Sequence, residues 1–143
     1  MILVLRTRFP EVRTRITKRD VAAAFRLLML HPSLCLLMAT ELTRRFFNLQ
    51  GKDVVMFYLA MPFGRNGSQA HFAVFGDAIA AAHCAHGLAD HPELSQLPFQ
   101  SRMYVDDGIF VELEKIPRMN TSTAVWEKFA RGLLGHQSIN KEN

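Results

Sequence analysis

The chain has 143 residues, 49% of them hydrophobic and 21% charged, with a net charge of +4 and an isoelectric point near 9.4. This length and composition predict one domain with a packed core and exclude a wholly disordered chain. We find no apolar run long enough to cross a membrane, and the apolar start at residues 1–5 is too short for a secretory signal. Cys35 and Cys84 lack paired spacing, so we expect free thiols and a cytosolic or nuclear protein that is not secreted.

Basic residues crowd the first twenty positions, where only Glu11 and Asp20 oppose them. They are Arg6, Arg8, Arg13, Arg15, Lys18 and Arg19. Such a segment suits a polyanion such as nucleic acid. A solvated strand face or a frayed chain end explains the same charges, so composition leaves both interpretations open.

The first predicted element is a strand over residues 12–19, where β-branched residues alternate with charged ones up to Asp20. Three alanines at positions 22–24 then favour a helical turn, which Pro32 interrupts. We expect Ser33 to cap a short apolar helix that continues to about residue 40.

Two strands are predicted next, over residues 44–48 and 54–60. A loop with one proline and two glycines covers residues 61–68, and Ser68 is a suitable N-cap for the following helix. That alanine-rich helix should end at Gly87.

The last predicted elements are a β-hairpin and a helix. Apolar runs at 102–105 and 108–111 flank the polar Asp106-Asp107-Gly108, which predicts a strand–turn–strand unit. Thr121 or Ser122 could cap the final helix, in which apolar residues recur at helical spacing. Strands and helices in this order predict an α+β fold, an antiparallel sheet with helices packed on one face.

Three motifs are candidates for chemistry, and each has a simpler explanation. Two adjacent carboxylates at Asp106 and Asp107 repel each other unless a divalent cation lies between them, but Asp-Gly alone also makes turns. Asp20 ends a strand, and an aspartate before an alanine run is commonly a helix N-cap. The loop at 61–68 can be an ordinary strand–helix connection.

Together and in this order, the three motifs resemble the palm of reverse transcriptases. The family has an aspartate followed four and five residues later by alanine and an aromatic residue, as in Asp20, Ala24 and Phe25. Its Leu-Pro-Gln-Gly loop ending in Ser-Pro corresponds to residues 61–70, and its Tyr-x-Asp-Asp motif is present at residues 104–107. The resemblance covers residues 16–143 and implies a polymerase palm-like sheet.

The resemblance implies a two-metal site that uses Mg²⁺, with Mn²⁺ as an alternative. Asp20 and Asp106 would bridge the two ions, Asp107 would complete the site, and the carbonyl of Val21 would be a further ligand. Carboxylates that converge from separate strands suit such a pair of ions, which stabilises the attacking and leaving oxygens of phosphoryl transfer.

Further residues match positions that contact nucleotide or nucleic acid in the family. The ring of Phe25 would exclude a ribose 2′-hydroxyl, although burial in the core explains a phenylalanine equally simply. The nucleotide-binding positions also include Phe63 and Gly64. The primer and template positions are Met103, Tyr104, Gly67 and Ser68.

The implied activity is RNA-directed DNA polymerisation by a retrotransposon enzyme. The enzyme would bind an RNA or DNA template with a primer and deoxynucleoside triphosphates. We expect no association with a membrane. Phe63 replaces the family's glutamine, and Gln69 replaces the proline after Ser68.

We expect an incomplete enzyme. Residues 1–15 are a basic segment and a candidate remnant of the fingers, and the thumb and ribonuclease H domains are expected to lie beyond Asn143. Whether the isolated chain is active therefore stays open. The alternative is a non-catalytic nucleic-acid-binding remnant of a degenerate element.

Two further features have structural explanations. His83, Cys84, His86 and His91 invite a zinc interpretation, but their spacing fits no standard site and they are predicted to be polar residues at a helix end. Trp126 is predicted to anchor the last helix in the core.

Overall fold

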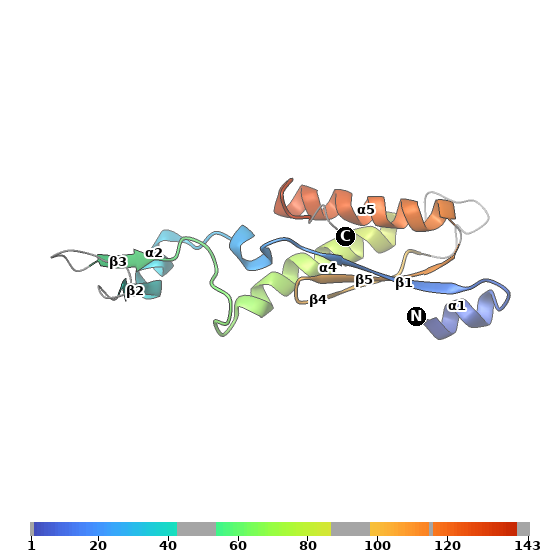
Figure 1. Cartoon of the computed structure of the whole chain (residues 1–143), viewed down its shortest axis with the longest axis horizontal. Coiled ribbons are helices and arrows are strands. Elements are labelled where there is room, and N and C mark those ends of the chain that lie inside the picture. The colour runs from blue at the N-terminus through green and yellow to red at the C-terminus, as the bar shows by residue number, and fades with distance from the viewer. Residues whose placement is uncertain (1, 43–53, 87–97, 115, 140–143) are drawn as a thin grey trace.

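The computed structural model describes residues 2–42, 54–86, 98–114 and 116–139. Figure 1 shows an elongated molecule, with a body of sheet and long helices and an arm that projects from one end. Within the described residues, no helix is both long and apolar enough to cross a membrane. The elements in chain order are α1 (Ile2–Arg8), β1 (Thr14–Asp20), η1 (Ala24–Leu27), α2 (Pro32–Cys35), η2 (Leu36–Met38), β2 (Ala39–Leu42), β3 (Val54–Phe57), α4 (Ser68–His86), β4 (Ser101–Tyr104), β5 (Asp107–Leu113) and α5 (Ile116–Leu134).

The body contains a three-stranded antiparallel sheet in the order β1-β5-β4. The predicted α+β class is therefore confirmed, as are the strand leading to Asp20 and the hairpin after residue 100. Asp107 lies opposite Asp20 on one side and Tyr104 on the other. Because paired residues of a sheet point to the same face, these three side chains share a face.

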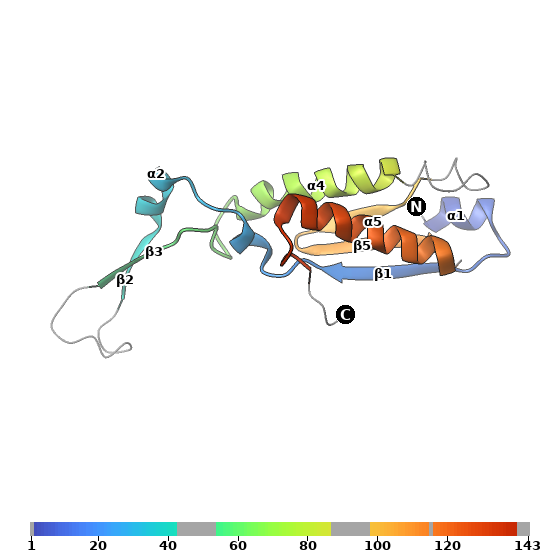
Figure 2. The same cartoon turned by 90° about the horizontal axis from the view of Figure 1, so that it is seen from above.

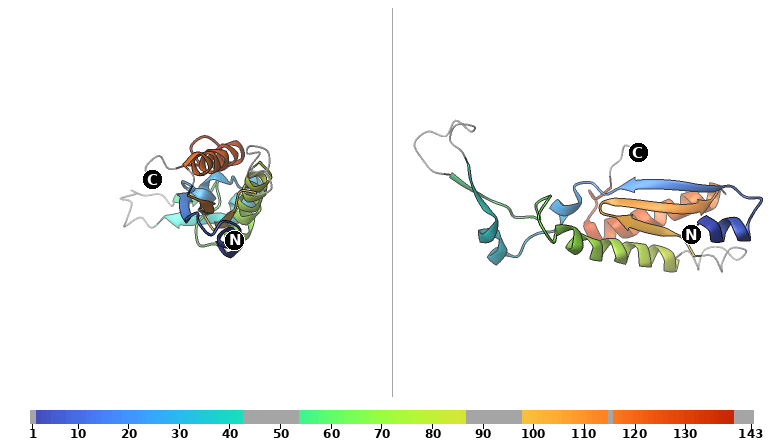
Figure 3. Two further views of the ribbon diagram at one scale, coloured as in Figure 1. Left: turned by 90° about the vertical axis from the view of Figure 1, so that its right-hand side faces the viewer. Right: turned by 90° about the horizontal axis from the view of Figure 1, so that it is seen from below.

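Helices α4 and α5 lie side by side on the opposite face of the sheet (Figures 2 and 3). Trp126 of α5 is fully buried against Gly108, where an added Cβ would lie 2.5 Å from the indole ring. Gly76 of α4 likewise allows a close approach by Met103 of β4, whose side chain would lie 2.9 Å from an added Cβ. Glycine at these two positions lets each helix pack directly on the strands, and the predicted core role of Trp126 is confirmed.

A helix that the sequence reasoning missed, α1, lies against the other face of the sheet (Figure 3). Leu5 is buried with Val111 and Leu113 of β5, and Phe9 and Val12 pack against this cluster. The expectation that the helices occupy one face holds for α4 and α5 but is wrong for α1. Alternation along β5 gives the reason, since Val111 and Leu113 point away from α5 and need their own cover.

The arm consists of α2, η2 and the two-stranded antiparallel sheet of β2 and β3 (Figures 1 and 2). The predicted strand at 54–60 is shorter in the structure, and the one at 44–48 lies outside the described residues. In the structure β3 pairs with β2 instead. The first residues of β2 were predicted to belong to the short helix that continues to about residue 40. His31 rather than Ser33 caps α2, because the His31 ring accepts a hydrogen bond from the Ser33 amide.

The long helices begin differently from their predicted starts. Ser68 is the first residue of α4, and its hydroxyl donates to the carbonyl of Pro62 instead of accepting from the helix. Gly87 lies outside the described residues. Helix α5 begins at Ile116, upstream of the predicted caps, and the Thr121 hydroxyl donates to the carbonyl of Pro117 within that helix. In both cases the hydroxyl donates to a carbonyl, a common alternative to capping.

His83 and His86 lie in the last turn of α4, as predicted for residues at a helix end, but the burial of His83 was not predicted. His83 is fully buried between the hydroxyls of Ser101 and Ser122, with N···O distances of 2.9 and 3.0 Å. Beside it, Glu112 and Arg118 form a buried ion pair with an N–O distance of 2.6 Å. The sheet and both long helices thus share a polar network inside the core, and His91 lies outside the described residues.

Candidate metal and nucleotide site

The acidic hairpin turns through Val105 and Asp106, whereas we expected the turn at Asp106-Asp107-Gly108. The antiparallel ladder continues through Tyr104 and Asp107, so Asp107 already belongs to β5. Val105 has a φ of 56°, and Asp106 does not share this positive φ, which is typical of a type II′ turn. A β-branched residue in this region stores strain of roughly 1–3 kcal/mol, a feature that clusters at functional sites.

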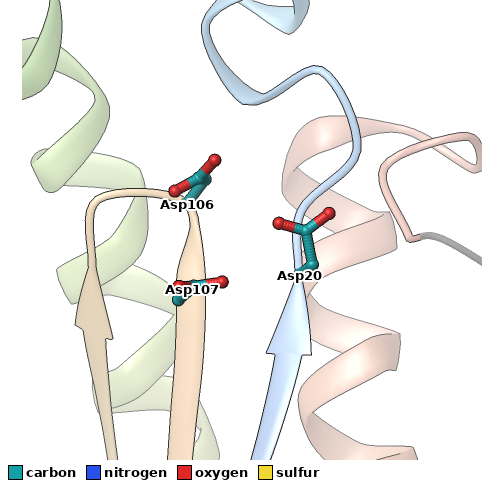
Figure 4. A group of neighbouring side chains, drawn as sticks. All are labelled: Asp20, Asp106 and Asp107. Atoms are coloured by element: carbon teal, nitrogen blue, oxygen red, sulfur yellow. The ribbon is translucent and has the colours of Figure 1, made fainter. Parts of the chain in front are cut away.

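Three carboxylates converge at this turn, as Figure 4 shows. Asp20 ends β1 directly opposite Asp107, and the amide of Val21 donates to the carbonyl of Asp106 at 2.9 Å. One oxygen from each of Asp20, Asp106 and Asp107 lies within 4.8 Å of the others, and all three residues are half-buried. Two strands of the sheet and one turn therefore bring the predicted ligands together.

The segment after α5 supports Asp20 from the other side. The amide of Ala22 donates to the carbonyl of Ser138 at 2.8 Å, and Val21 forms an isolated β-bridge with Ile139. Ser138 and Ile139 are both buried. The chain leaving Asp20 is thus fixed between the hairpin turn and the C-terminal segment.

Lys18 places a positive charge beside the three aspartates. Its Nζ lies 2.7 Å from an Asp107 carboxylate oxygen, and both side chains are accessible to solvent. The hydrogen bond to Asp107, together with the charges of the neighbouring aspartates, raises the pKa of Lys18 above its ordinary value. Lys18 therefore already offsets part of the repulsion between the carboxylates.

A cleft of about 920 Å³ opens beside the carboxylates. It contains Asp20, Val21, Phe25, Phe63 and Asp106, so it unites predicted metal and nucleotide positions. Its other lining residues are Ala23, Ala24, Arg26, Phe57, Tyr58, Leu59, Ala60, Met61 and Pro62. The cleft thus joins acidic, aromatic and basic groups at the junction of body and arm.

Phe25 lies in the core and also lines the cleft. It is 5% exposed and contacts Phe72 of α4 with ring centroids 5.6 Å apart. Its ring also lies 5.6 Å from that of Phe63, which is 81% exposed. The core thus holds the Phe25 ring in place at the wall of the cleft, and sugar selection by this ring stays a prediction.

The glycines of the loop after the cleft have backbone conformations that favour glycine. Gly64 has a φ of 80° and Gly67 a φ of 92°. An added Cβ at Gly64 would meet no atom within 4 Å, so its surroundings are open. Ser68 is buried by its bond to Pro62 and is a structural anchor of this loop. Contacts of these residues with nucleotide or template stay predictions.

The two hairpin residues proposed for primer contact point to opposite faces. Tyr104 is 72% exposed and shares the face of Asp107. The side chain of Met103 packs on Gly76 of α4, on the helix-covered face. Tyr104 is therefore placed where a ligand of the carboxylates could touch it, whereas the Met103 side chain is committed to packing.

Sequence reasoning missed Arg26, Lys18 and Ser138 as parts of this site. Arg26 directly follows Phe25 in the sequence. Lys18 lies two residues before Asp20 and therefore on the same face of β1, so the period of the strand could have indicated that Lys18 belongs to the site. No sequence signal points to Ser138, because its role depends on how the chain folds back after α5.

Comparison of the sequence with models of known families and with curated proteins finds no match. The site itself can be tested for its fit to a metal. Clusters of exposed acidic groups are common without metals, but here half-buried carboxylates converge from separate parts of the sheet. Hard oxygen ligands of this kind fit Mg²⁺ or Mn²⁺.

Proposed function

We propose that this chain is the palm of a template-directed nucleotidyl transferase, an RNA-directed DNA polymerase of retrotransposon type. The observation that carries the proposal is the convergence of Asp20, Asp106 and Asp107 beside an aromatic-walled cleft, which Asp20 and Asp106 line. Such an enzyme would act in the cytosol or the nucleus on a primed RNA or DNA template and deoxynucleoside triphosphates.

The three aspartates would hold the divalent ions. When bound, such ions stabilise the charge on the attacking and leaving oxygens of phosphoryl transfer. The protein's own contribution is position, since the β1–β5 ladder sets Asp20 against Asp107 and the Val21 amide ties the turn to β1. Fixed carboxylates need no rearrangement when charge develops, which is how preorganised sites accelerate reactions.

The cleft would receive the incoming nucleotide. Phe25 is held by the core and lines the cleft together with Asp20 and Asp106, a position that suits exclusion of a 2′-hydroxyl. Phe63 replaces a polar residue of the family and offers an exposed apolar ring instead. We therefore expect base contacts in this cleft to depend on stacking more than on hydrogen bonds.

The proposal is tested by primer extension with the whole chain, an RNA template, a DNA primer and Mg²⁺ or Mn²⁺. Asp106→Asn keeps the shape of the side chain but removes its charge, so we expect product to fall at least about a hundredfold. Asp77→Asn is the matched control, because Asp77 is an exposed aspartate on α4 outside the carboxylate cluster.

Two outcomes would overturn the proposal. Extension that survives Asp106→Asn would show that the carboxylates do not carry the reaction. Salt-sensitive binding of nucleic acid without extension at any concentration of either metal would instead support the non-catalytic alternative. A cooperative thermal transition of each variant confirms that the comparison is between folded proteins.

A further inference from the structure

Arg26 is the one basic residue among the described residues that line the cleft. It lies on η1, one residue after Phe25, and its side chain is exposed to solvent. The turn that starts η1 fixes its backbone, because the Arg26 amide donates to the carbonyl of Ala23 at 2.7 Å. Arg26 therefore projects from a short, defined turn beside the carboxylate cluster.

Among the described residues, the ion pairs around the site do not involve the Arg26 guanidinium. Lys18 pairs with Asp107, and Arg19 pairs with Glu127 of α5. Within the described part of the chain, Arg26 makes no ion pair, although Asp20 and Asp106 line the same cleft. A guanidinium is always charged and presents several donors, so one that faces a cleft without a partner suits an anionic ligand.

The remaining walls indicate the rest of that ligand. Phe25, Phe57, Tyr58 and Phe63 supply aromatic surface to the same cleft. Aromatic side chains offer faces and edges to a planar ring, while the carboxylates that line the cleft suit a cation rather than an anion. A ligand with a planar ring, several negative charges and an associated divalent cation would match the aromatic side chains, the guanidinium and the carboxylates that line the cleft.

We propose that Arg26 binds the phosphate chain of a nucleoside triphosphate in this cleft. The inference rests on the proposed function and adds to it a cationic group for the triphosphate within this chain. Bidentate contacts from a guanidinium to phosphate oxygens are strong and directional, whereas an ammonium acts as a point charge. Arg26→Lys should therefore restore part of the affinity that Arg26→Ala removes.

The test is equilibrium dialysis of labelled deoxythymidine triphosphate against the whole chain with Mg²⁺, with labelled thymidine as the ligand that lacks phosphate. Loss of a charged hydrogen-bonding partner predicts about a tenfold weaker binding of the triphosphate to Arg26→Ala. Thymidine binding should not change. Arg65→Ala is the matched control, because Arg65 is an exposed arginine of the neighbouring loop that does not line the cleft.

The outcomes separate this inference from the proposed function. Equal triphosphate binding by the original chain and Arg26→Ala, or no binding by either, overturns the role of Arg26. Primer extension by Arg26→Ala with an unchanged KM for the triphosphate would overturn that role as well. Arginine-dependent binding without any primer extension supports the phosphate site while the polymerase proposal fails.

Discussion

At the scale of single residues, Lys18 offsets part of the negative charge of the three aspartates. Its Nζ lies 2.7 Å from Asp107, one of the three proposed metal ligands. The hydrogen bond to Asp107 raises the pKa of Lys18, so the ammonium stays charged at neutral pH. Lys18 thus competes for the same carboxylate that a divalent ion would use.

We predict that Lys18→Met binds Mn²⁺ more tightly than the original chain does. The pair is exposed to solvent and its competition is modest, so the expected gain is roughly threefold in affinity. Electron paramagnetic resonance of free Mn²⁺ measures it directly. Arg15→Met is the control, since Arg15 lies on the same strand as Lys18 and forms an ion pair of the same length with Glu114. Weaker Mn²⁺ binding by Lys18→Met would instead make Lys18 a residue that positions Asp107.

At the scale of elements, His83 joins α4 to both β4 and α5. A carbonyl can only accept, so Nε2 of His83 donates to the carbonyl of Ser122 at 3.0 Å, and Nδ1 accepts from the hydroxyl of Ser101 at 2.9 Å. Acceptance at Nδ1 is the role of the neutral ring, the form that burial favours. Burial, with smaller effects of Arg118 and His86, lowers the pKa of His83 to about 4.

The lowered pKa predicts a loss of stability in mild acid. Between about pH 6.5 and 4, the unfolded chain binds a proton at His83 while the folded chain does not, so the free energy of unfolding falls as the pH falls. The slope approaches about 1.4 kcal/mol per pH unit, with an upper bound on the order of 3 kcal/mol in total. Urea unfolding at several pH values measures this dependence.

His83→Gln should be less stable at pH 7 but should lose this part of the pH dependence. His71→Gln is the control, because His71 is an exposed histidine on the same helix. If His83→Gln keeps the original slope between pH 6.5 and 4, the dependence arises from other groups, and the neutral buried ring is excluded as its cause.

These elements also show what the sequence could predict. Alternation and the acidic motif were enough to predict β1 and the hairpin, because local pattern indicates strands. The approach of Asp20 to the hairpin aspartates was expected only from the resemblance to the polymerase palm. The burial of His83 could not be predicted, since its partners lie 18 and 39 residues away along the chain. The turn at Val105 was also missed, because β-branched residues are poor candidates for a positive φ.

At the scale of the whole molecule, the body and the arm differ in how they are stabilised. The body buries two apolar clusters, a larger one beneath α4 and α5 and a smaller one beneath α1. The arm leaves much of its apolar surface exposed, and Figures 1 and 2 show it projecting beyond the body. Its exposed apolar residues are Leu34, Leu36, Leu37, Val55, Met56 and Phe57. The cleft lies between these two regions, so one wall of the candidate site depends on the less packed part.

We predict that amide hydrogens of β2 and β3 exchange at least about tenfold faster than those of β5. A two-stranded sheet without a packed face is marginally stable alone, whereas β5 is the central strand of its sheet and carries four consecutive buried residues at its end. Exchange followed by mass spectrometry measures both regions in one sample, and the flanking strand β1 provides an internal reference. Equal protection of β3 and β5 would contradict a marginally stable arm. Repeating the measurement at tenfold lower protein concentration separates intrinsic protection from protection by self-association, because only the latter declines on dilution.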